Sequence, residues 1–129
     1  MTLPSSSTIR QTIEQYLHLA ATGSGAEIAA IYAEGATVED PVGSAPHVGT
    51  EQIAAFYDSV RGAGRSIELI TLRIAADTAA FHFRVTSPSA EAIVVTEPID
   101  VMTFDSEGRI TSMRAIWSQD DLVITPVER

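Results

Sequence analysis

The aspartate at position 100 lies where an acid is not expected. It falls in the segment Pro98–Phe104, which predicts a strand because apolar and β-branched residues precede the turn formers Asp105–Gly108. Side chains alternate between the two faces of a strand, so Asp100 shares a face with Met102 and Phe104. Burial on an apolar face raises the pKa of a carboxyl group, and a neutral acid can donate a hydrogen bond. We therefore expect Asp100 to act as a buried, neutral donor.

A second acid, Asp40, ends a short predicted strand over residues 36–40. It shares the parity of Ala36 and Val38, which places it on the core side, and Pro41 stops the strand directly after it. This position predicts a carboxylate at the rim of an internal pocket. An Asp-Pro turn in an ordinary loop is the alternative interpretation.

The three tyrosines of the chain form a pattern. Tyr16, Tyr32 and Tyr57 each lie on the apolar stripe of a different predicted helix. A buried phenol needs a hydrogen-bond partner, and for any one of them a nearby carbonyl would be enough. Three inward-facing phenols beside a buried acid favour a shared polar network.

Two acids in one apolar pocket can take different roles when their surroundings differ. An ionised Asp40 at the rim would accept a proton, while a neutral Asp100 would donate a hydrogen bond to a developing oxyanion. Tyr16 would supply a second donor. This arrangement suits proton abstraction next to a carbonyl, with the enolate oxygen held in an oxyanion hole.

The elements that position these residues predict an α+β fold. Helical periodicity marks one helix after the caps Ser5–Thr8, a short second helix that carries Tyr32, and a third from Thr50. After residue 65 the chain turns to strands, expected over residues 66–76, 78–86, 91–104 and 109–118. We expect one domain over residues 1–129, with three N-terminal helices packed on a curved, mostly antiparallel sheet and a pocket between the layers.

Composition excludes several classes of partner. The 129 residues carry 8 basic and 17 acidic side chains, a net charge of -9, which repels phosphate backbones and anionic lipid. We therefore expect no nucleic-acid partner, and without a long apolar run we expect no membrane partner. The first residues lack a secretory pattern and cysteine is absent, so the cytoplasm is the predicted compartment.

The histidines do not indicate a metal site. His18, His47 and His82 are scattered without the paired spacing of metal ligands, and a surface or loop position is the better interpretation. No phosphate-binding loop or nucleophile elbow is present either. We expect no metal and no cofactor.

Four stretches together resemble a known family. They are Val38-Glu39-Asp40-Pro41, the segment Glu51–Tyr57, Ile99-Asp100-Val101-Met102 with Phe104-Asp105, and Met113 through Trp117-Ser118. Over residues 16–118 the chain resembles the bacterial Δ5-3-ketosteroid isomerases of the NTF2-like superfamily. A neutral carboxylic acid in an oxyanion hole is already known from this family.

The resemblance implies a cone-shaped α+β fold, no cofactor, a homodimer formed through the sheet, and a small-molecule steroid as substrate. Asp40 would move a proton from C4 to C6 of a 3-oxo-Δ5-steroid, Tyr16 and Asp100 would hold the dienolate oxygen, and Tyr32 and Tyr57 would support Tyr16. Ile110 and Ile116 would face the dimer partner. The apolar candidates for contact with the steroid, from the resemblance and from strand and helix faces, are Phe56, Phe83, Met102, Met113, Ala115 and Trp117.

Several positions depart from the family pattern and bear on the substrate range: Pro98 before Asp100, Pro88 between Ser87 and Ser89, and Ile116 before Trp117. Two other functions fit the same scaffold, because one fold hosts many functions. They are a non-catalytic carrier of a hydrophobic ligand and a related polyketide cyclase or dehydratase.

Overall fold

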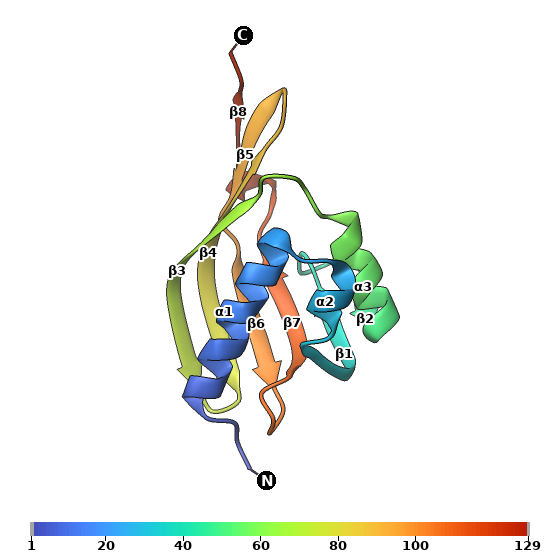
Figure 1. Cartoon of the computed structure of the whole chain (residues 1–129). Helices are drawn as coiled ribbons and strands as arrows, with labels where there is room; N and C mark the ends of the chain where they lie inside the picture. The colour runs from blue at the N-terminus through green and yellow to red at the C-terminus, as the bar shows by residue number, and fades with distance from the viewer. Residues whose placement is uncertain (1, 129) are drawn as a thin grey trace.

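A computed structural model describes residues 2–128. Within them the chain forms three α-helices and eight strands, and one layer of helices covers one face of a curved sheet (Figure 1). The helices are α1 (Ser6–Thr22), α2 (Gly25–Ala29) and α3 (Thr50–Ser59). The strands are β1 (Tyr32–Glu39), β2 (His47–Val48), β3 (Ser66–Ala75), β4 (Thr78–Pro88), β5 (Ala92–Thr96), β6 (Ile99–Phe104), β7 (Ile110–Ile116) and β8 (Leu122–Pro126). The predicted α+β class is confirmed.

The sheet is mixed but mostly antiparallel. Its order is β2-β1-β7-β6-β4-β5-β8, and β3 pairs with β4 outside this path. The pairing of β1 with β7 is parallel, whereas every other pairing among the described residues is antiparallel. The parallel pair brings the end of β1, which leads to Asp40, beside the end of β7, which leads to Trp117.

Helix α1 lies along the inner face of the sheet (Figure 1). The Ser5 side chain caps it by accepting a hydrogen bond from the Thr8 backbone N–H. Ile9, Ile13 and Tyr16 repeat at helical spacing and are buried against the sheet. The same periodicity that packs the helix therefore carries the Tyr16 phenol into the core.

Helices α2 and α3 touch closely at a glycine. A Cβ atom on Gly25 would overlap the Ala54 carbonyl, and the Gly25 N–H donates to the Asp58 carboxylate over 2.8 Å. Any larger residue at position 25 would push the helices apart. This contact fixes α3, which brings Tyr57 over the sheet.

Tyr32 and Ile110 take positions that differ from those predicted from the sequence. Tyr32 begins strand β1 instead of lying on the second helix, because α2 already ends at Ala29. Ile110 is fully buried instead of facing outward, because a register shift between β6 and β7 turns it into the core while Ile116 stays on the outer face.

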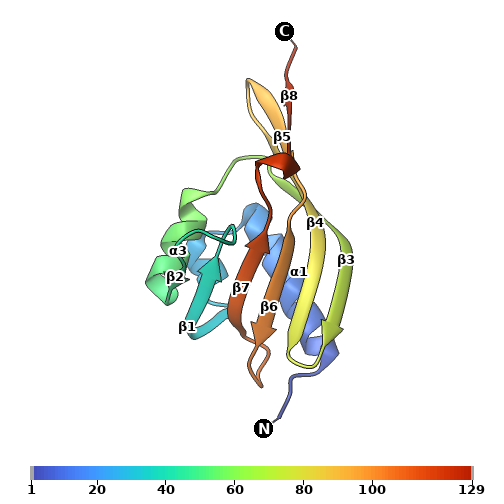
Figure 2. The ribbon, with the colours of Figure 1, turned by 180° about the vertical axis from the view of Figure 1, so that it is seen from behind.

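The predicted strand over residues 91–104 is two strands. β5 ends at Thr96 and β6 starts at Ile99, with Pro98 between them. Proline has no N–H to donate to a strand ladder, which accounts for the break. β5 then pairs with β8, a strand not predicted from sequence, to form a ribbon that projects beyond the helices (Figures 1 and 2).

No helix within residues 2–128 is long and apolar enough to cross a membrane. The predicted domain also includes Met1 and Arg129, which lie outside the described residues.

Candidate active site

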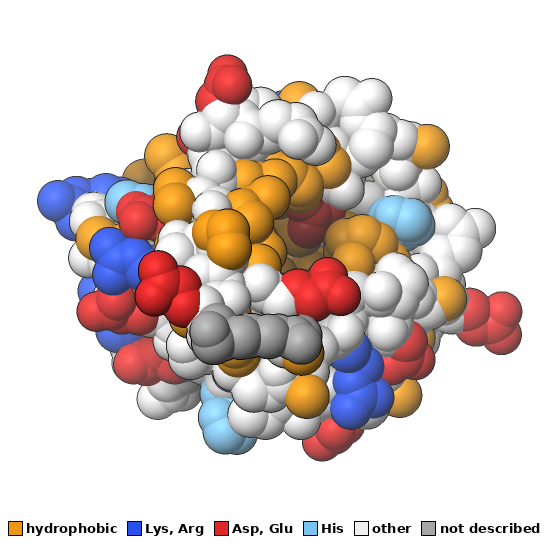
Figure 3. Space-filling view, turned by 90° about the horizontal axis from the view of Figure 1, so that it is seen from above, with side chains coloured by type: hydrophobic (Ala, Val, Ile, Leu, Met, Phe, Trp, Pro, Cys, Tyr) orange, Lys and Arg blue, Asp and Glu red, His pale blue; other side chains and the backbone are white. Residues whose placement is uncertain are grey.

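A cavity of about 230 Å³ lies between the helices and the inner face of the sheet. Seen from the end of the molecule, it is a hollow with largely apolar walls and an acidic side chain inside it (Figure 3). A closed cavity of about 150 Å³ holds a benzene ring, so this open one admits a ligand of more than one ring. Tyr16, Asp40, Tyr57 and Asp100 all line it.

Asp100 lies at the deep end of the cavity. It sits in β6 between Phe81 of β4 and Ala115 of β7, and only 1% of its surface is exposed. Neither of its carboxyl oxygens has a hydrogen-bond partner among the described residues. Such a group is costly to ionise.

The surroundings of Asp100 favour its neutral form. Burial raises its pKa well above the ordinary value, and the negative charge of Asp40 acts in the same direction. The nearby Tyr16 hydroxyl has the opposite effect on this pKa, but the two groups fall short of hydrogen-bond geometry, so burial dominates. A neutral Asp100 is left with an O–H group free to donate into the cavity.

Asp40 follows the last residue of β1 and is only partly buried. The Trp117 indole donates from Nε1 to its Oδ1 over 2.6 Å. Burial raises the pKa of Asp40, while the Trp117 hydrogen bond and the charges of Arg65 and His47 lower it. Its carboxylate is thus stabilised by contacts that Asp100 lacks.

The three tyrosines form a chain of hydroxyl groups. The Tyr57 hydroxyl lies 3.1 Å from that of Tyr16 and 2.7 Å from that of Tyr32. All three phenols are buried, and burial raises the pKa of each well above its usual value. They therefore act as neutral hydrogen-bonding groups. Tyr32 reaches Tyr16 through Tyr57, because no direct bond joins them in the described chain.

The apolar candidates separate into two groups. Phe56, Phe83, Ala115 and Trp117 line the cavity. Met102 and Met113 are in the core beneath its wall, exposed by 0% and 1%, and neither is part of the lining.

Some residues of the site were not found from sequence. Arg61 and Arg65, which follow α3, line the cavity together with Thr96. Ser87, which the sequence already marked as a departure from the family pattern, lines it as well. Arginines in a loop after a helix carry no motif, so the sequence offered no signal for them. The Trp117 N–H is a further polar group of the site, since the strand pattern predicts only an apolar wall at this position.

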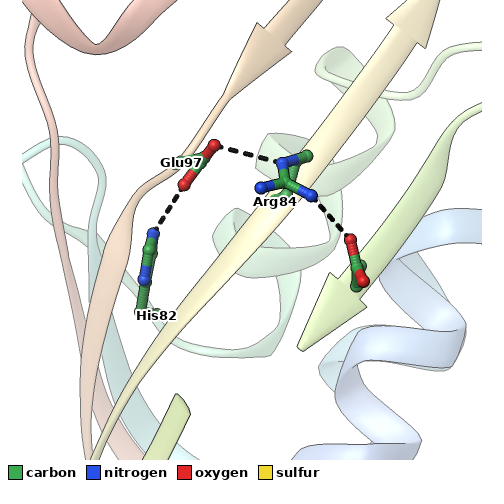
Figure 4. Close-up of polar contacts among 4 residues, drawn as sticks. His82, Arg84 and Glu97 are labelled. Carbon is green, nitrogen blue, oxygen red and sulfur yellow. Dashed lines mark hydrogen bonds and ion pairs between the residues drawn. The ribbon is translucent and has the colours of Figure 1, made fainter. Parts of the chain in front are cut away.

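His82 and His47 make contacts outside the group of Asp40, Asp100 and the three tyrosines. His82 is on the outer face of β4, where its Nε2 lies 2.9 Å from a Glu97 carboxyl oxygen (Figure 4). Arg84 bridges the second Glu97 oxygen and Glu68, at 3.1 Å and 2.8 Å. His47 stacks on Phe56 with ring centroids 4.5 Å apart. Within residues 2–128 no three acidic or histidine side chains form a group suited to a metal ion.

Comparison with known proteins gives three findings. Residues 13–113 match the SnoaL-like domain family. The Steroid Delta-isomerase of Nocardioides simplex is 49% identical over 121 residues, which cover 94% of this chain and 98% of that protein. A solved structure of SalBIII, an epoxide hydrolase/cyclase-like enzyme of pyran ring formation in the polyether salinomycin, matches with a TM-score of 0.81 and 23% identity over 93% of this chain and 98% of its own. At that identity the SalBIII likeness extends to the fold alone.

Proposed function

Because the chain belongs to the SnoaL-like family and is closely related to a steroid Delta-isomerase, we propose that it converts 3-oxo-Δ5-steroids into 3-oxo-Δ4-steroids. The enzyme is a steroid Delta-isomerase that moves a carbon–carbon double bond within one molecule. The proposal assigns the chemistry to residues of the cavity between the helices and the sheet.

The observation that supports this function best is a pair of acids in unlike surroundings. Asp40 has an indole N–H on its carboxylate, while Asp100 is buried without a partner among the described residues. One acid is thereby suited to accept a proton and the other to donate a hydrogen bond. A binding site for an apolar ligand needs neither.

In the proposed reaction Asp40 takes a proton from C4 of the steroid, and the electron pair of the C4–H bond moves toward the 3-oxo group. This yields a dienolate whose negative charge rests on the oxygen at C3. The same carboxyl group then returns the proton to C6, and the double bond ends between C4 and C5. No proton or electron is gained or lost overall, so the reaction balances without an external oxidant, reductant or proton donor.

The negative oxygen is held by two neutral donors, the Tyr16 hydroxyl and the Asp100 carboxyl. Each stabilises the charge more as it develops, which lowers the barrier instead of only binding the substrate. When Tyr16 donates to the steroid, it can accept from Tyr57, and Tyr57 can accept from Tyr32. The tyrosine chain therefore orients Tyr16 as a donor. Phe56, Phe83, Ala115 and Trp117 provide the apolar contacts with the rings.

Ultraviolet absorbance tests the function, because a conjugated enone appears only if the double bond moves. With 5-androstene-3,17-dione we expect enone absorbance to grow at a rate proportional to enzyme concentration. A phenolic steroid that mimics the dienolate should compete strongly. A carrier of hydrophobic ligands would bind the steroid with no change in absorbance, and this result would exclude the isomerase.

We further propose a homodimer formed through the outer face of the sheet. Ile99 and Ile116 are paired across β6 and β7, and they are 44% and 52% exposed. Paired apolar side chains on a sheet face suit a two-fold interface, in which the same patch serves both copies. Sedimentation equilibrium should give twice the mass of the chain. The whole chain as one domain and a cytoplasmic location stay predictions from the sequence.

A further inference from the structure

The mouth of the cavity carries positive charge in a chain whose net charge is -9. Arg61 is exposed and Arg65 is half-buried, and both line the cavity just after Val60. The deep lining residues Tyr16 and Asp100 are 4% and 1% exposed, so the arginines mark the opposite, open end.

Arg65 has one N–H donor without a partner and forms no ion pair among the described residues. Its Nη1 donates to the Val60 carbonyl over 3.0 Å, but its Nε is buried and has no partner within residues 2–128. None of the ion pairs formed by the described residues includes Arg65. A buried N–H without a partner is uncommon in folded proteins and calls for an acceptor. Arg61, in contrast, forms an ion pair, since its Nη1 lies 3.7 Å from Oδ1 of Asp58.

The sheet register places two hydroxyl groups near Arg65. Ser66 pairs with Thr86, which brings Arg65 next to Ser87 at the end of the sheet. Thr96 of β5 pairs with Val85 at the same end. Ser87 and Thr96 both line the cavity. The mouth therefore offers guanidinium and hydroxyl donors, whereas the body of the cavity is mostly apolar.

On the proposed isomerase function, the oxygen at C3 lies against Tyr16 and Asp100, so a rigid steroid must point its D ring at the mouth. We propose that the mouth binds an anionic substituent on the D ring, with Arg65 as the specificity-determining contact and Arg61 beside it. A carboxylate would accept charge-assisted hydrogen bonds from Arg65 and from the neighbouring hydroxyls. The preferred substrates are thus 3-oxo-Δ5-steroids with an acidic group at C17.

The test compares two substrates of nearly the same shape, 3-oxo-5-androstene-17β-carboxylic acid and its methyl ester. We expect the wild-type enzyme to have a KM for the acid on the order of tenfold lower than for the ester. High salt should reduce this preference, since the site is open to solvent. Arg65→Gln should bring the ratio of the two KM values close to one. The loss of this charge also raises the pKa of Asp40, but it acts on both substrates alike, so the ratio of their kcat values should change little. Arg65→Lys should restore part of the preference for the acid over the ester.

Arg10→Gln is the matched control, since it removes one exposed positive charge on α1 away from the cavity. It should leave the preference for the acid intact. Equal KM values for acid and ester in the wild type, or an unchanged preference in Arg65→Gln, would overturn the proposal.

A second measurement separates this proposal from the isomerase itself. Trp117 is the single tryptophan and lies in the cavity, so its fluorescence reports binding without turnover. If no substrate is turned over, the isomerase proposal fails, and the Kd values of the 4-ene-3-oxo acid and ester then decide the role of Arg65. Tighter binding of the acid that depends on Arg65 would support it, and equal binding would refute it.

Discussion

Trp117 donates a hydrogen bond from its indole N–H to Asp40 across 2.6 Å, although the two residues are 77 positions apart in the chain. The parallel pairing of β1 with β7 brings them together, since Glu39 is opposite Arg114 in the register. A hydrogen bond to a carboxylate favours its charged form. Trp117 thereby offsets part of the burial that raises the pKa of Asp40.

Trp117→Phe should shift the pH dependence of the enzyme. Phenylalanine keeps an aromatic wall but removes the N–H, so the pKa of Asp40 rises further above its usual value. Because Asp40 must be ionised to act as the proposed base, the acidic limb of the profile of kcat/KM should move to higher pH. An acidic limb at the wild-type pH would show that the indole N–H does not tune Asp40.

Asp40→Asn should nearly abolish turnover of 5-androstene-3,17-dione. The amide fills the same space but accepts no proton from carbon, so kcat falls while the cavity stays intact. Binding of the dienone product, read from Trp117 fluorescence, should remain measurable. Near-normal turnover in this variant would contradict the proposed mechanism.

Tyr57→Phe and Tyr32→Phe should differ in their effect on rate. Tyr57 bonds directly to Tyr16, so its loss removes the group that orients the donor and should lower kcat about tenfold. Tyr32 acts only through Tyr57, so Tyr32→Phe should cost less. Tyr16→Phe, which removes a proposed oxyanion donor, should lower kcat by a factor on the order of 10²–10³. Equal losses of kcat in all three variants would mean that the three tyrosines act only as one packing unit.

Asp100→Asn should change how stability depends on pH. Burial raises the pKa of Asp100 in the folded state, so the folded state holds a proton that the unfolded state releases. The stability linked to this proton is complete below the unfolded pKa of about 3.9 and is lost as pH rises toward the folded value. Urea unfolding should therefore show the variant gaining stability relative to wild type from pH 4 upward. A difference that does not vary with pH would contradict the raised pKa.

The inward positions of Asp40 and Asp100 followed from strand parity alone. Alternation fixes which face a side chain takes once a strand is recognised, and Ala36, Val38 and Met102 are indeed buried. The same rule failed for Ile110, because a bulge adds a residue to one strand without a marker in the sequence.

Contacts that depend on pairing between distant segments could not be predicted from sequence. The Trp117–Asp40 bond requires the parallel pair of β1 and β7, which local patterns do not encode. Tyr32 was misplaced because its spacing from Ile28 and Ile31 fits a helix as well as a chain turning into a strand. Its burial was still inferred correctly, since it depends on the apolar surroundings in either case.

In the proposed mechanism, the two acids of the cavity hold opposite protonation states. Carbon NMR on protein with ¹³C-labelled aspartate carboxyls, assigned with Asp40→Asn and Asp100→Asn, tests it most directly. We predict that the Asp100 carboxyl keeps the chemical shift of a neutral acid through the pH range in which Asp40 ionises and the enzyme gains activity. An Asp100 signal that titrates near the model value of about 3.9 would contradict the account.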